Sequence, residues 1–158
     1  VIDVPDKIKG GYYGVLFFEN ETQEAVNEKG VKIVARVGCL FFLEAQNKIK
    51  KGHVEKISVE ANQLKGKLVN QGDVVLVAHP VFYIMNAEGI IADRGEVRKL
   101  FVPPGETGEF EIALKKDMRP GTYTLVMTSD LEEGDVLVKE VDFKKTASGS
   151  LSITAARD

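Results

Sequence analysis

Strand-type patterns of apolar and polar residues dominate the chain. Residues 12–18 are aromatic and β-branched, and residues 31–43 form a longer apolar segment that opens with alternation at the two-residue spacing of a strand. Helical periodicity is confined to residues 23–28, which lie in an acidic stretch. The pattern therefore predicts an all-β protein.

The second half of the chain contains a regular series of short apolar segments. They run from residue 57 to residue 143 and are separated by turn sequences such as those at 70–73, 86–89 and 103–106. Short strands with a turn about every 8–12 residues are typical of an immunoglobulin-like β-sandwich. We therefore predict one complete sandwich over residues 48–145.

One turn sequence occurs twice. Residues 6–12 read DKIKGGY and residues 117–123 read DMRPGTY, and each copy leads into an apolar strand. In immunoglobulin-like domains a tyrosine at the start of the next-to-last strand bonds back to the backbone and forms a tyrosine corner. We predict such corners at Tyr12 and Tyr123. The second copy closes the sandwich, whereas the first has almost no strand before it, so residues 1–47 are predicted to be the closing β-hairpin of a second, incomplete immunoglobulin-like unit.

The linker and the tail are polar. Residues 45–52 are basic and end in glycine, which places a boundary near residue 48. The tail, 146–158, is predicted to be flexible, although Leu151 and Ile153 are spaced like a short strand that would pair with an exposed edge. Two strands cannot hold a core of their own, so residues 12–43 require completion by preceding sequence, by this tail or by a second chain.

Composition excludes several classes of partner. Apolar residues make up 44% of the 158 residues, the net charge is −3 and the sequence pI is about 5.5, so we expect a packed core and no nucleic-acid partner. No apolar run is long enough for a membrane span. The single cysteine, Cys39, cannot form an intrachain disulfide, and its apolar neighbours predict a buried, inert thiol.

No catalytic constellation is present in the sequence. His53 and His79 lack a second ligand at metal-binding spacing, so no metal site is expected. An acidic loop over residues 130–135 is better explained as a solvated turn than as a weak calcium site. No nucleophile elbow or phosphate-binding loop occurs. We therefore expect a non-enzymatic protein without a cofactor.

The order of these features resembles the periplasmic fimbrial (pilus) chaperones, which have two immunoglobulin-like domains. Residues 4–18 (VPDKIKGGYYGVLFF) are similar to the penultimate strand of that family's first domain, and residues 30–38 (GVKIVARVG) to its last strand. Residues 68–123 resemble its second domain. The resemblance covers most of the chain and implies an extracytoplasmic, periplasmic or cell-surface protein.

The resemblance also implies a binding mode. In the family, alternating apolar residues of the last strand complete a partner subunit that lacks a strand. The matching positions here are Val31, Ile33, Ala35 and Val37. The competing interpretation is that these side chains pack within their own domain, as in any half-buried strand. The family's anchoring lysine late in this strand has no counterpart, because residues 37–47 contain no lysine or arginine.

Two broader interpretations of function therefore stay open. The first is a protein-binding or assembly module that pairs strands with a partner or with itself through an exposed strand edge. The second is a structural or carbohydrate-binding accessory domain of a larger surface protein, for which Phe82 and Tyr83 supply candidate aromatic rings. Adjacent strand residues face opposite ways, so one of these two rings is expected in the core.

Overall fold

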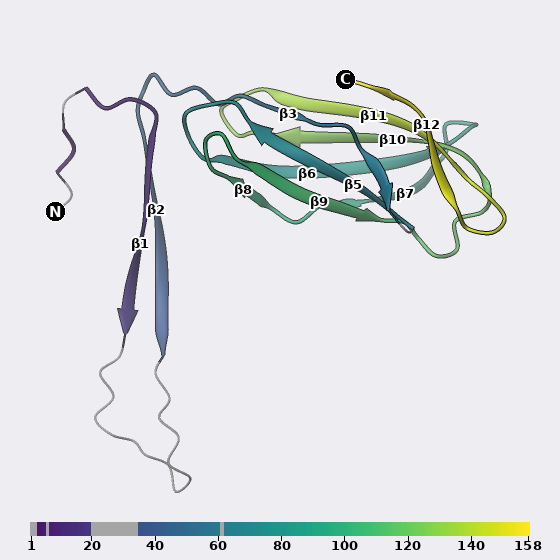
Figure 1. Ribbon diagram of the computed structural model, residues 1–158, viewed down its shortest axis with the longest axis horizontal. Helices are drawn as coiled ribbons and strands as arrows, with labels where there is room; N and C mark the ends of the chain where they lie inside the picture. The colour runs from purple at the N-terminus through teal and green to yellow at the C-terminus, as the bar shows by residue number, and fades with distance from the viewer. Residues whose placement is uncertain (1–2, 6, 20–34, 61) are drawn as a thin grey trace, which may run out of the picture.

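The computed structural model describes residues 3–5, 7–19, 35–60 and 62–158, which form twelve β-strands and no helix. The prediction of an all-β protein is confirmed. The strands belong to a separate two-stranded hairpin and to two larger antiparallel sheets, one with six strands and one with four. Figure 1 shows the hairpin projecting from one end of the body that the two larger sheets form.

The six-stranded sheet has the order β12-β11-β10-β6-β7, with β8 also paired to β6. Its strands are β6 (Leu76–Asn86), β7 (Ile91–Glu96), β8 (Leu100–Val102), β10 (Gly121–Asp130), β11 (Val136–Lys145) and β12 (Leu151–Arg157). In the four-stranded sheet, β5 pairs with β3, β4 and β9. Its strands are β3 (Gly52–Val54), β4 (Ser58–Glu60), β5 (Gln63–Asn70) and β9 (Thr107–Ala113).

The core lies between these two sheets. Buried side chains alternate with exposed ones along β5, β6 and β10, as expected for strands with one face in a core. Leu64 of the small sheet and Leu125 of the large sheet are fully buried members of one hydrophobic cluster. This two-layer arrangement is consistent with an immunoglobulin-like sandwich.

The packing of Phe110 in the core requires a glycine at residue 66. Gly66 of β5 lies directly opposite Phe110 of β9, and a Cβ atom at residue 66 would lie 2.3 Å from that ring. Phe110 is itself almost fully buried. The absent side chain therefore provides the space in which the ring packs.

The expectation of a flexible tail was wrong. Residues 151–157 form β12, which pairs with β11 and places Leu151 and Ile153 against the core. Arg157 holds the end of the strand through ion pairs to Asp142 at 2.7 Å and Glu140 at 3.2 Å. The tail thus covers one edge of the sandwich, as the alternative interpretation supposed, and it does not complete the hairpin.

Candidate functional site

The hairpin is the part of the molecule with the most unusual surface. It consists of β1 (Gly11–Glu19) and β2 (Arg36–Glu44), which pair in antiparallel register from Gly11 opposite Glu44 to Glu19 opposite Arg36. Among the described residues neither strand pairs with any other strand. Each therefore has one outer edge whose backbone groups no described strand covers.

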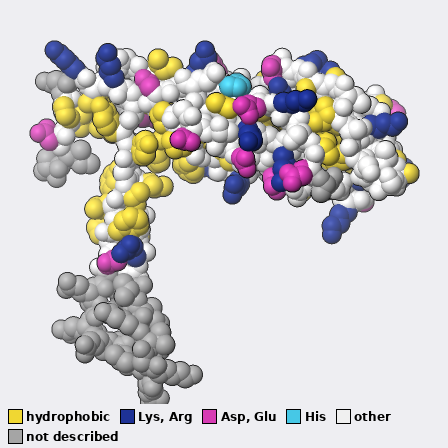
Figure 2. Space-filling model, viewed as in Figure 1, with side chains coloured by type: hydrophobic (Ala, Val, Ile, Leu, Met, Phe, Trp, Pro, Cys, Tyr) yellow, Lys and Arg dark blue, Asp and Glu magenta, His cyan; other side chains and the backbone are white. Residues whose placement is uncertain are grey.

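Large apolar side chains cover the hairpin and are exposed. Eleven of its eighteen residues are exposed large hydrophobics. They are Tyr12, Tyr13, Val15, Leu16, Phe17, Phe18, Val37, Leu40, Phe41, Phe42 and Leu43. Figure 2 shows apolar side chains along the face of the projecting hairpin that is in view. Contiguous exposed patches of this kind are rare on monomeric proteins and mark sites of interaction.

Both faces of the hairpin are apolar. Because strand side chains alternate, the register defines a Phe42 face and a Phe41 face. The Phe42 face carries Tyr13, Val15, Phe17, Leu40 and Phe42, and the Phe41 face carries Tyr12, Leu16, Phe18, Val37, Cys39, Phe41 and Leu43. A strand pair that packed on a core by one face alone would be expected to keep its other face polar.

Backbone hydrogen bonds join the base of the hairpin to the sandwich. The Gly11 amide donates to the carbonyl of Asp73 at 2.8 Å, and the Ala45 amide donates to the carbonyl of Gly10 at 2.9 Å. Gly10 has a φ of +65°, and a Cβ atom there would lie 2.7 Å from the Asp73 carbonyl oxygen. A glycine at residue 10 is thus needed both for the turn and for this close approach.

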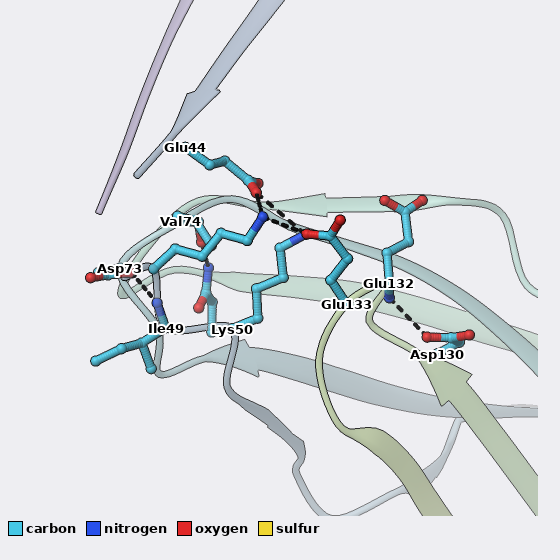
Figure 3. Close-up of polar contacts among 10 residues, drawn as sticks. Glu44, Ile49, Lys50, Asp73, Val74, Asp130, Glu132 and Glu133 are labelled. Carbon is cyan, nitrogen blue, oxygen red and sulfur yellow. Dashed lines mark hydrogen bonds and ion pairs between the residues drawn. The ribbon is translucent and has the colours of Figure 1, made fainter. Parts of the chain in front are cut away.

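Charged side chains reinforce the base. The Lys48 ammonium lies 2.6 Å from Glu44 of β2 and also pairs with Glu133 of the acidic loop, and the Lys50 ammonium lies 3.5 Å from Glu44 (Figure 3). Hydrogen bonds that Lys48 donates to Glu133 and, with a smaller effect, to Glu44 raise the pKa of Lys48 to about 12. The same bond to Lys48 lowers the pKa of Glu133 below its ordinary value. The hairpin, the linker and the acidic loop are thereby connected electrostatically.

The contacts of its carboxylates explain why the loop over residues 130–135 is acidic. Asp130 accepts a hydrogen bond from the Glu132 amide, and Glu133 pairs with Lys48. Glu132 lies 3.9 Å from Lys99. No group of three or more potential metal ligands lies close together among the described residues. Asp130, Glu132 and Glu133 of this loop are therefore turned toward lysines or toward the loop's own backbone.

The predicted strand-binding residues are only partly described. Val37 is exposed on the Phe41 face of β2, and Ala35, which precedes the strand, is exposed as well. Val31 and Ile33 lie outside the described residues. The binding residues predicted from the sequence end at Val37, whereas residues 40–42 also belong to β2 and are among its exposed apolar side chains. The signal was present in the uninterrupted apolar run of residues 39–43.

Cys39 lies on the hairpin and is exposed. The prediction of a buried thiol was therefore wrong. Apolar sequence neighbours indicated burial, but Leu40, Phe41 and Phe42 are themselves exposed, and of these only Phe42 stacks on a described ring outside the hairpin.

The two predicted tyrosine corners have different structures. The Tyr123 hydroxyl donates to the carbonyl of Arg119 at 2.7 Å, which is the hydrogen bond of a tyrosine corner, and its ring stacks on Phe143 in the core. The Tyr12 side chain is instead 55% exposed, and its hydroxyl has no hydrogen bond to any described residue. The first copy of the turn serves to connect the hairpin to the sandwich through Gly10 and Gly11.

The candidate aromatic site on the sandwich has one exposed ring. Phe82 is buried, whereas Tyr83 of β6 is 41% exposed, as the alternation of strand residues predicts. Tyr83 lies directly opposite Arg94 of β7. A shallow hollow beside them is also lined by Glu96.

The described part of the chain contains no helix with the length and hydrophobicity that crossing a membrane requires. No protein-family model matches the chain, and no characterised protein matches it.

Proposed function

We propose that the chain is a protein-binding module whose β1–β2 hairpin pairs with β-strands of a partner protein. One observation carries this proposal: the hairpin is apolar on both faces, and along each strand it has a backbone edge that no described strand covers. Strand addition uses both features, since the edge supplies backbone hydrogen bonds and the alternating side chains supply specificity.

The exposed apolar surface of the hairpin favours a bound state. A two-stranded hairpin is marginal by itself in water, and covering one large apolar side chain contributes about 1.5–3 kcal/mol. The hairpin exposes eleven such side chains. Each of these side chains is already partly covered, so each gains less than this full value, and the sum over several of them offsets the entropic cost of association.

The sandwich supports this role by orienting the hairpin. Backbone hydrogen bonds from Gly11 and Ala45, together with the Lys48 ion pairs, fix the base of the hairpin to a packed body. Such fixation lowers the entropic cost of presenting the strands to a partner. The proposal needs neither a catalytic group nor a cofactor.

The finer form of the proposal follows the resemblance to pilus chaperones. In that form the protein is extracytoplasmic and non-enzymatic, and its partner is a β-sandwich subunit that lacks a strand. The partner would contact the alternating side chains Val31, Ile33, Ala35 and Val37. The exposure of Val37 supports this assignment.

A peptide experiment tests the proposal. The chain is titrated with synthetic 12-residue peptides that alternate apolar and polar side chains, and hydrogen exchange is followed at the amides of β1 and β2. We expect slower exchange along one hairpin strand, weakened by Leu40→Lys and unchanged by Tyr83→Ala on the sandwich. Peptide binding that leaves every hairpin amide unchanged would contradict the proposal, and so would a monomeric chain that binds none of the peptides.

A carbohydrate-binding function is the second candidate, because Tyr83 presents an exposed ring beside Arg94 and Glu96. Aromatic rings next to charged groups can stack on sugar rings while polar groups bond to hydroxyls. Binding on a glycan array that is lost in Tyr83→Ala and kept in Leu40→Lys would support it. An array without signal would count against it.

A further inference from the structure

The sequence of β2 has a symmetry that bears on its partner. The strand begins with Arg36 and ends with Glu44, Leu40 lies midway, and the seven residues between the two charges are uncharged. Natural edge strands are normally protected against self-pairing by charges or prolines along their length. β2 has charges only at its two ends, and these charges are opposite in sign.

This symmetry gives a self-complementary register. If two β2 strands pair in antiparallel fashion about a twofold axis at Leu40, then Arg36 of each copy lies opposite Glu44 of the other. In the same register Gly38 lies opposite Phe42 and Cys39 lies opposite Phe41. Opposite charges that face each other across an antiparallel pair are stabilising, and like charges are destabilising.

The side chains around Gly38 fit this register. The ring of Phe17 lies over Gly38 on the Phe42 face, since a Cβ atom at residue 38 would be 3.0 Å from that ring. Phe42 of a second copy would approach Gly38 from its other side. Phe17 and Val15 already occupy the position of the missing Cβ atom, so the Phe42 ring of the second copy would pack beside the Phe17 ring.

Self-pairing along the outer edge of β1 has less charge complementarity than self-pairing along β2. A twofold axis at Val15 would place Glu19 opposite Gly11, and no opposite charges would meet. The pairing that brings both charges of a strand into contact is therefore available to β2 alone.

We propose that β2 pairs with β2 of a second copy of this chain in the register centred on Leu40, which would form a four-stranded sheet across a twofold axis. This inference rests on the proposed function, because it names the partner of the same hairpin. It produces a closed, isologous contact in which each copy uses the same surface. The two Phe42 faces would form one continuous apolar surface.

The existing ion pairs are compatible with the contact. Arg36 already pairs with Glu19, and Glu44 with Lys48 and Lys50. A guanidinium has five N–H donors and a carboxylate has about four acceptor positions, so each group can bind a second partner. The Arg36 side chain is also 57% exposed.

Sedimentation equilibrium on two matched variants tests the edge that is used. Leu40→Lys places two ammonium groups opposite each other at the axis, whereas Val15→Lys, directly across the hairpin on the same face, changes the other strand. We expect a dimer whose dissociation constant rises roughly a hundredfold in Leu40→Lys and much less in Val15→Lys. Equal effects of the two variants would overturn the use of β2.

Charge variants test the register. Arg36→Glu and Glu44→Arg each place like charges opposite each other at both ends of a self-paired strand, so each variant alone is expected to dimerise roughly tenfold more weakly. A mixture of the two variants restores opposite charges at both ends. Native mass spectrometry should therefore show mainly mixed dimers, and a statistical mixture would overturn this register.

Cys39, the single cysteine of the chain, provides a further measurement on the unaltered protein. In the proposed register the two Cys39 residues are diagonal neighbours, about 7–8 Å apart between Cα atoms. A short bismaleimide should link two copies efficiently, and Leu40→Lys should abolish this link.

Three outcomes separate this inference from the proposed function. A chain that stays monomeric at millimolar concentration but shows hairpin protection with strand peptides overturns the second-copy inference and leaves strand pairing in place. A monomer that binds no peptide overturns both. A monomer that binds phosphatidylcholine vesicles through the hairpin also overturns the second-copy inference.

Discussion

The ring of Phe42 in β2 stacks on the ring of Phe101 in β8, with centroids 6.2 Å apart and an interplanar angle of 13°. Phe101 also lies under the ammonium of Lys99, 5.4 Å from the ring centroid. This aromatic contact is where the apolar surface of the hairpin meets the sandwich. It adds side-chain packing to the backbone hydrogen bonds at Gly11 and Ala45.

Phe101→Ala is expected to loosen the hairpin without unfolding the sandwich. The aromatic pair contributes about 0.5–1.5 kcal/mol, and Phe101 is half exposed, so the core loses little. Hydrogen exchange at the amides of Gly11 and Ala45 should accelerate up to about tenfold, with a melting temperature close to that of the parent. Phe41→Ala, on the opposite face, is the matched control, and equal acceleration by it would contradict this role of the stacking.

The Lys48 ion pairs should make the position of the hairpin depend on pH at both extremes. The pKa of Glu133 is lowered from 4.5, so its stabilising contribution is present above 4.5 and is lost as the pH falls through the folded value. The pKa of Lys48 is raised from 10.5 to about 12, so its contribution is present below 10.5 and is lost as the pH rises toward 12.

A nitroxide attached to Cys39 can measure this dependence. Its paramagnetic broadening of sandwich amides should be constant between about pH 5 and 10 and should decrease outside that window, because the ion pairs are then lost. Lys48→Met should show the smaller broadening at every pH. An unchanged pH profile in Lys48→Met would rule out the ion pairs as its cause.

The two copies of the repeated turn should respond differently to the same substitution. Tyr123→Phe removes the hydrogen bond to the Arg119 carbonyl, which should cost about 1 kcal/mol and lower the melting temperature by about 3 °C. Tyr12→Phe removes an exposed hydroxyl and should leave the melting temperature unchanged. Calorimetry measures the melting temperatures of both variants. Equal decreases would show that Tyr12 also forms a tyrosine corner.

Gly66→Ala should disturb the core of the sandwich. The new methyl group would lie 2.3 Å from the ring of Phe110, and this ring is tightly enclosed, so the overpacking should cost about 1–3 kcal/mol of unfolding free energy. Gly14→Ala in β1 is the control, because nothing lies within 4 Å of its added Cβ atom. Denaturant unfolding followed by circular dichroism would measure both, and a neutral Gly66→Ala would contradict the packing argument.

Much of the sandwich could be predicted because its determinants are local. Alternation along β5 and β10 places every second side chain on one face whatever the rest of the chain does. The turns at 86–89 and 103–106 depend on glycines, since Gly89 and Gly105 both have a φ of +75°. These features depend on a few neighbouring residues, and the sequence displays them directly.

The candidate site was predicted less completely. The alternation of apolar residues along 31–37 predicted Val37 as a partner-binding residue. The sequence did not predict that Phe17, Leu40 and Phe42 are exposed. An apolar run indicates that a segment favours burial, and it does not indicate which surface covers it. The exposure of Cys39 was missed for the same reason.

The sequence by itself determined the strands, the turns and the position of the repeated corner, because backbone dihedral preferences and side-chain alternation act over a few residues. Only the tertiary structure decided which strands meet. It paired β12 with β11, gave Tyr123 a part-buried hydrogen bond and left Tyr12 exposed. It also joined Gly11 to Asp73, so that the hairpin stands apart from the sandwich. Pairing and coverage depend on segments distant in sequence, so identical turn patterns acquired different roles from their surroundings.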